Sequence, residues 1–205
     1  MRMIKIFDSE NYQAHWKKYK RDSARAIIFV DGKLVMIKSD KYGEYKFPGG
    51  GINSGETHMD AILREVREET GLHVLPASIK EYGKTLILRK GISGDEIFEQ
   101  ESFYYLCSVD TENRSQPKLD DGYETEYGYK LVYASLDEAI DANEKLLDMP
   151  DIPWVQRDLT VLCELRERIT NGFCLELDDG RRSGEENGWL LVKDVFDCLE
   201  ERYNG

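Results

Sequence analysis

The chain has 205 residues and a formal net charge of −12 at pH 7; 40% of its residues are hydrophobic and 33% are charged. This is the composition of a polar globular protein, and the length suits one large domain or one domain with an elaboration. The negative charge argues against a general binder of duplex nucleic acid, which needs a basic surface, but divalent cations can bridge an acidic protein to an anionic substrate.

The four cysteines of the chain lie far apart and form no CxxC pair; they are Cys107, Cys163, Cys174 and Cys198. This spacing indicates neither a zinc site nor a disulfide framework, so reduced thiols are expected. The first residues lack the apolar core of a signal peptide, and no apolar run approaches the length of a membrane span. We therefore expect a cytoplasmic protein without a membrane partner.

Short apolar runs rich in β-branched residues predict strands along most of the chain. The first two runs flank Asp31-Gly32, a dipeptide that favours a tight hairpin turn. Three consecutive glycines, residues 49–51, end the loop that follows this hairpin. The predicted strands are residues 24–30, 34–39, 84–90, 101–109 and 129–134.

Three segments predict helices. The first has Thr57 and Asp60 at capping-box spacing, and Gly71 stands where a helix-ending glycine belongs. The second opens with Ser135 and has Glu138 three residues later. Strands and helices thus mix along the chain, which favours helices packed on a mixed sheet. The predicted helices are residues 57–70, 135–148 and 154–169.

The pattern weakens beyond Asn171. Residues 173–177 suit a strand, and residues 189–203 suit a terminal amphipathic helix. The aliphatic face of residues 189–199 is expected to be buried against another apolar surface. It either packs on its own domain or forms the seam of a homodimer.

The first predicted helix carries an unusual cluster of acids. With about 100° between successive residues, one stripe faces the core, and Glu65, Glu68 and Glu69 project together on another side. Three carboxylates on one rigid patch suit Mg²⁺ or Mn²⁺, and Arg64 beside them can hold a carboxylate in place. The alternative is a solvated glutamate face. The predicted core stripe is Met59, Ile62, Leu63, Val66 and Thr70.

The wider pattern decides between these readings. Gly50, Glu56 and the run Arg64-Glu65-Val66-Arg67-Glu68-Glu69-Thr70-Gly71-Leu72 resemble the Nudix box at every defined position. The chain is therefore similar to the Nudix hydrolases. This resemblance implies an α/β fold, the Nudix-type α/β/α sandwich with a mixed β-sheet, over residues 24–170. An N-terminal segment, residues 1–23, and a C-terminal extension, residues 171–205, flank that domain.

The resemblance also implies roles for individual residues. Glu65, Glu68 and Glu69 match the metal-binding carboxylates of the family, and Glu65 also matches the position often assigned as general base. Arg64 matches the arginine that orients this glutamate, Glu56 is the supporting first acid of the box, and the carbonyl of Gly49 matches a further metal ligand. The implied cofactor is Mg²⁺ or Mn²⁺. An additional acid often comes from a downstream loop, where the candidates are Glu124 and Glu126; a solvated loop is the alternative.

The implied reaction is hydrolysis of a pyrophosphate bond, by attack of water at phosphorus, in a nucleoside diphosphate-linked or nucleoside triphosphate substrate. The alternative is a Nudix-fold nucleotide sensor or partner-binding module without turnover. Such modules usually lose box acids or carry a DNA-binding domain, whereas this chain keeps every box residue. Cues to a particular substrate are absent. Tyr42, Tyr45 and Phe47 can stack on a nucleotide base, and packing in the core or at its rim is their alternative.

Overall fold

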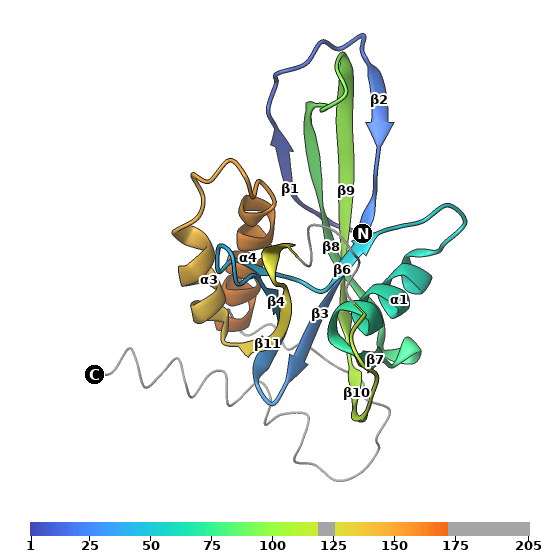
Figure 1. The fold of residues 1–205 in the computed structure, drawn as a ribbon, viewed down its shortest axis with the longest axis vertical. Helices are drawn as coiled ribbons and strands as arrows, with labels where there is room; N and C mark the ends of the chain where they lie inside the picture. Colours follow the sequence, from blue (N-terminus) through green and yellow to red (C-terminus); the bar gives the residue numbers. More distant parts are fainter. Residues whose placement is uncertain (119–125, 172–205) are drawn as a thin grey trace. The chain divides into compact units, whose positions relative to one another are not determined.

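The computed structural model describes residues 1–118 and 126–171, and the chain divides into two compact units (Figure 1). The first unit comprises Met1–Ile27 and Phe47–Asp121, and the second comprises Ile28–Lys46 and Gly122–Gly205. The chain first passes from one unit to the other within strand β3 (Ser23–Val30).

Two long strands, β8 (Lys80–Lys90) and β9 (Glu96–Cys107), form an antiparallel hairpin within the sheet of the first unit. Strand β1 (Met3–Asp8) lies parallel to β8, and β2 (Lys17–Lys20) lies parallel to β9 (Figure 1). The short strand β6 (Gly49–Gly51) pairs antiparallel with β3. Parallel and antiparallel pairs therefore share one sheet, which confirms the α/β class and the mixed sheet that the sequence predicts.

Helix α1 (His58–Thr70) agrees with the predicted helix 57–70 to within one residue, since Thr57 is its N-cap. The Thr57 hydroxyl accepts a hydrogen bond from the Asp60 backbone, and the Asp60 carboxylate accepts one from the Thr57 backbone, so the capping box is complete. Gly71 ends the helix in the left-handed conformation, with φ of 73°. The buried face differs in part from the predicted stripe, because Met59 is 44% exposed. The buried residues of α1 are Ala61, Ile62, Val66, Glu69 and Thr70.

A small two-stranded sheet follows α1 in the first unit. Strand β7 (Leu72–Val74) pairs antiparallel with β10 (Val109–Arg114). A short 3-10 helix, η1 (Pro76–Ser78), leads from β7 into β8. The predicted strand 101–109 is therefore divided at Ser108 between β9 and β10.

In the second unit, β4 (Lys33–Lys38) folds back on the end of β3 as the predicted hairpin. Asp31 and Gly32 have φ of 50° and 72°, which is the sign that a two-residue hairpin turn requires. Strands β11 (Lys130–Ala134) and β5 (Tyr45–Lys46) both pair antiparallel with β4.

Two helices complete the second unit, α3 (Leu136–Glu144) and α4 (Val155–Thr170). The buried side chain of Asn143 joins α3 to β5, since its Oδ1 accepts from Tyr45 N at 2.8 Å and its Nδ2 donates to Tyr45 O at 2.9 Å. Helix α3 ends at Glu144, four residues before the predicted end at Asp148. No helix in the described part of the chain is long and apolar enough to cross a membrane.

The N-terminal segment contains two strands that the sequence does not predict. Strands β1 and β2 lie in the segment 1–23, for which the sequence predicts no strand, and their partners β8 and β9 are far away in the sequence. The predicted strand at 173–177 and the predicted terminal helix fall outside the described residues, and so do both alternatives for its aliphatic face, its own domain or a homodimer seam.

Candidate metal and catalytic site

The site is built around the glycine strand β6, which lies beside β3 in the first unit. The register places Arg25 opposite Gly49 and Ala24 opposite Gly50. Gly49 has φ of 136°, and a Cβ there would overlap the carbonyl oxygen of Ala24. Only glycine therefore lets the chain run this close to β3.

Glu65 of α1 lies directly against this strand. A Cβ on Gly50 would overlap both oxygens of the Glu65 carboxylate, so the missing side chain makes room for the acid. The Glu65 side chain is 16% exposed. The glycine strand and the helix thus hold one largely buried carboxylate between them.

Glu69 fixes the same two elements together. Glu69 is only 4% exposed, and its Oε2 accepts a hydrogen bond of 2.7 Å from the backbone N–H of Gly49. A buried carboxylate needs such partners because its desolvation is costly. Glu68, one position earlier on the helix, is more open, with a side chain 36% exposed.

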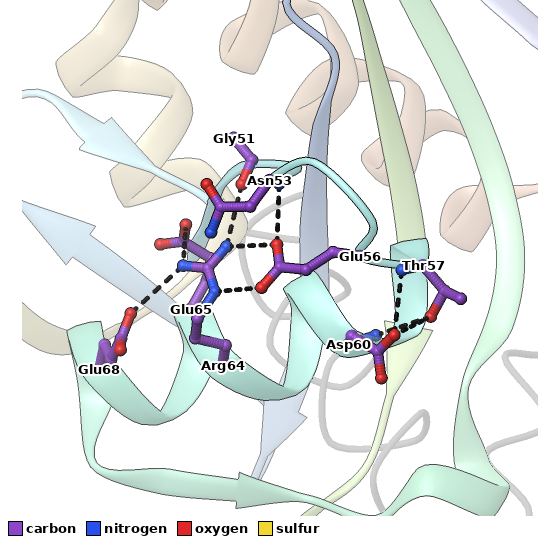
Figure 2. Close-up of polar contacts among 8 residues, drawn as sticks. All are labelled: Gly51, Asn53, Glu56, Thr57, Asp60, Arg64, Glu65 and Glu68. Atoms are coloured by element: carbon purple, nitrogen blue, oxygen red, sulfur yellow. Dashed lines mark hydrogen bonds and ion pairs between the residues drawn. The ribbon is translucent and has the colours of Figure 1, made fainter.

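Arg64 links the other acids (Figure 2). Its guanidinium binds Glu56 through two hydrogen bonds, Nε to Oε1 at 2.6 Å and Nη2 to Oε2 at 2.9 Å. Nη1 donates to Glu65 Oε1 at 2.6 Å and reaches Glu68 Oε2 at 3.3 Å, while Nη2 also donates to the carbonyl of Gly51 at 3.0 Å. One side chain therefore ties the loop, the glycine strand and the helix acids together.

The pKa values of Glu56 and Glu65, two acids bound by Arg64, are shifted in opposite directions. Hydrogen bonds from Arg64, helped by the backbone of Asn53, lower the pKa of Glu56 to about 2. Burial raises the pKa of Glu65, and this effect exceeds the opposing hydrogen bond from Arg64; the charge of Glu69 adds to the increase. A positive charge at Glu65 would relieve the cost of burying its carboxylate.

The chemistry of these donors fits a divalent metal ion. Glu65, Glu68, Glu69 and the carbonyl of Gly49 offer only oxygen atoms, the ligands that Mg²⁺ and Mn²⁺ prefer. As the side chains are placed, no three His, Cys, Asp or Glu residues in the described ranges converge into a metal-holding group. Arg64 instead serves as the cation at Glu65 and Glu68.

The structure also shows the surroundings of Glu126 and Phe47, two further residues that the sequence predicts for the site. Glu126 is exposed in the second unit and pairs with Lys41 Nζ at 2.6 Å, and Glu124 lies outside the described residues. Phe47 is fully buried, with its ring edge-on to Tyr104 at 5.6 Å between centroids.

The two tyrosines predicted beside Phe47 both belong to the second unit. Tyr45 is 1% exposed, and its hydroxyl donates to Glu138 at 2.6 Å. Tyr45, like Phe47, therefore takes the core-packing role that the sequence left as the alternative to base stacking. Tyr42 is partly exposed and lies edge-on to Tyr127 at 5.4 Å between centroids.

Arg25 belongs to the site although the sequence analysis did not single it out. Its Nη1 donates to the carbonyls of Phe47 at 3.1 Å and Gly49 at 2.8 Å. The signal in the sequence was a lone arginine inside an otherwise apolar predicted strand.

Comparison with known proteins assigns the chain to a family. The NUDIX domain profile matches residues 20–157, well over half of the chain. The chain therefore belongs to the NUDIX family, as the sequence predicts.

The individual relatives share limited sequence identity with the chain. The chain is 31% identical over 62 residues to an uncharacterized Nudix hydrolase, YvcI, of Bacillus subtilis, covering 30% of this chain and 39% of that protein. It is 29% identical over 100 residues to an RNA pyrophosphohydrolase of Psychrobacter cryohalolentis, covering 45% of this chain and 58% of that protein. The chain thus spans less than two thirds of the length of these curated relatives. A solved NUDIX hydrolase from Nitrosomonas europaea is 23% identical, with a TM-score of 0.46, over 68% of this chain and 88% of that chain.

Proposed function

We propose that this protein is a metal-dependent hydrolase that cleaves a pyrophosphate bond in a nucleoside diphosphate-linked or nucleoside triphosphate substrate. The observation that carries the proposal is the largely buried Glu65 carboxylate, which α1 packs against Gly50, a residue without a side chain. Glu56, Glu68, Glu69 and Arg64 surround it with the complete set of box residues. The name of the Psychrobacter relative supports a phosphoanhydride as the bond cleaved.

The residues that would hold Mg²⁺ or Mn²⁺ are Glu65, Glu68, Glu69 and the carbonyl of Gly49. When bound, such an ion neutralises phosphate oxygens and lowers the pKa of a bound water. The negative charge of the three carboxylates would attract this cation to the site. Arg64 keeps Glu65 oriented through Nη1, and Glu56 keeps Arg64 in place through its two-fold hydrogen bond.

Glu65 is the group that we assign as general base. Its partial burial and raised pKa suit a carboxylate that accepts a proton from attacking water, because a base works best when its pKa approaches the working pH. Positioning and charge stabilisation supply most of the remaining rate, as in phosphoryl transfer generally. The expected cytoplasmic location remains part of this proposal.

The test is a panel of nucleotide diphosphate compounds and triphosphates incubated with Mg²⁺ or Mn²⁺, with released phosphate and nucleoside monophosphate as the readout. Glu68→Gln should lower turnover by about 100-fold or more, since even residues that only support metal ligands typically contribute about 10- to 100-fold. Glu69→Gln should do the same, although it also alters the hydrogen bond to Gly49.

The matched control is Glu112→Gln, which removes an exposed acid of β10 and should leave turnover unchanged. Full activity in both folded glutamine variants, or hydrolysis that persists in excess chelator, would exclude the metal-dependent mechanism. Tight nucleotide binding without turnover across the whole panel would instead favour the sensor alternative.

A further inference from the structure

Arg25 holds three consecutive residues of the site from the side of β3. Its Nη1 donates to Phe47 O at 3.1 Å and Gly49 O at 2.8 Å, while the carbonyl of Pro48 between them accepts from the backbone N–H of Ala26 at 2.8 Å. Successive carbonyls of an extended chain point in opposite directions, so those of Phe47 and Gly49 share one side. A single guanidinium nitrogen can therefore fix both.

Gly49 is consequently held at both ends by charged side chains. Its N–H donates to Glu69 of α1, and its carbonyl accepts from Arg25 of β3. Glycine has wide conformational freedom, and the φ of 136° at this residue lies outside the range that other residues favour. The direction of this carbonyl therefore depends on external contacts, and Arg25 donates the side-chain hydrogen bond that fixes it.

We propose that Arg25 is a positioning residue that aims the Gly49 carbonyl oxygen at the divalent cation. A carbonyl oxygen has two lone pairs; Arg25 takes one, and the other remains for the metal. The inference rests on the proposed function, because it assigns Arg25 a task at the same metal site.

Two effects of Arg25 on metal binding have opposite signs, which makes the inference testable. As a positive charge near the carboxylates, the guanidinium repels a cation, so its removal should strengthen binding if charge alone mattered. As the group that fixes the Gly49 carbonyl, it preorganises a ligand, so its removal should weaken binding. Supporting partners of metal ligands typically contribute about 10- to 100-fold in affinity, and we expect this positioning effect to dominate.

The experiment measures Mn²⁺ binding to the full chain without substrate, using electron paramagnetic resonance to count free Mn²⁺. Arg25→Met should raise the dissociation constant at least about tenfold. The matched control is Arg21→Met, which removes a positive charge near Gly51, where the Arg21 Nε lies 3.7 Å from the position of an added Cβ. The control should not weaken binding. A metal-free thermal melt shows whether each variant is folded.

A second readout separates positioning from a loss of structure. In Arg25→Met the Mg²⁺ concentration for half-maximal hydrolysis should rise, while kcat at saturating Mg²⁺ returns to the level of the unaltered chain. Mn²⁺ binding by Arg25→Met that equals or exceeds that of the unaltered chain overturns the inference while leaving the proposed function intact. Absence of Mn²⁺ binding in the unaltered chain overturns the proposed metal site, and the inference with it.

If Arg25→Met does not fold, Arg25→Lys decides the question. Lysine retains the charge but lacks the planar fork of arginine, so it cannot reproduce the same fixed pair of contacts. Weaker Mn²⁺ binding by this variant supports positioning, and unchanged binding overturns it.

Discussion

At the scale of single residues, the site depends on the absence of a Cβ atom at Gly49 and Gly50. Gly49 lets the chain approach the Ala24 carbonyl, and Gly50 leaves the space that the Glu65 carboxylate fills. Neither requirement concerns flexibility in a loop. Each is a close contact in which an added methyl group would displace either the Ala24 backbone or the Glu65 carboxylate.

Gly50→Ala tests the contact with Glu65. Because the added Cβ would overlap both Glu65 oxygens, the carboxylate must move, and we expect hydrolysis to fall on the order of 100-fold or more with weaker Mn²⁺ binding. Gly51→Ala is the matched control in the same strand, since its Cβ would meet only the Arg21 side chain, at 3.7 Å. Equal activity of the two alanine variants would contradict the assigned contact between Gly50 and Glu65.

At the scale of elements, local signals predicted what local contacts stabilise. Local contacts set both ends of α1: the capping box of Thr57 and Asp60 begins the helix, and the left-handed Gly71 ends it. The Asp31-Gly32 turn sets the β3–β4 hairpin in the same way. Sequence patterns alone therefore located these elements and the box acids on them.

Two strands that depend on distant partners and carry little local signal, β1 and β2, were not predicted. Strands β1 and β2 are exposed along much of their length and lack the clean alternation of a half-buried strand; they exist because β8 and β9 offer them edges far along the chain. The same reason explains Arg25, whose role appears only when β3 lies beside β6. It also explains Phe47, whose ring packs on the distant Tyr104.

The contact between Glu56 and Arg64 ties the loop before α1 to the helix, and it predicts a pH dependence. Arg64 lowers the folded-state pKa of Glu56 from 4.5 to about 2. A depressed folded pKa contributes stability that is complete above the unfolded pKa and is lost as the pH falls through the folded pKa. The contribution of Glu56 should therefore decline between about pH 4.5 and pH 2.

The measurement is urea unfolding of the unaltered chain and of Glu56→Gln at several pH values in that window. The difference in unfolding free energy should be largest near neutral pH and should shrink towards pH 2, because glutamine cannot lose a proton. Glu112→Gln, at an exposed position, provides the control and should follow the unaltered chain at every pH. A difference that stays constant with pH would show that the charge of Glu56 does not stabilise the fold.

At the scale of the whole molecule, the chain forms two compact units. Every box residue belongs to the first unit, together with Arg25 and the glycine strand, whereas Tyr42, Tyr45 and Glu126 belong to the second. The sequence could not reveal this division, because the boundary passes through the continuous apolar strand β3 and returns after β5. Each unit is built from two separate stretches of the chain.

This division predicts where metal binding stabilises the protein. A ligand that binds only the folded state at 100 times its dissociation constant adds about 2.7 kcal/mol of stability. Because all proposed ligands lie in the first unit, hydrogen exchange with Mn²⁺ present should slow in α1 and β6 and remain unchanged in β4 and β11. Glu68→Gln should lose the slowing in α1. An equal gain in both units would mean that they unfold as one cooperative body, and no gain in either would contradict a cation seated on the acids of α1.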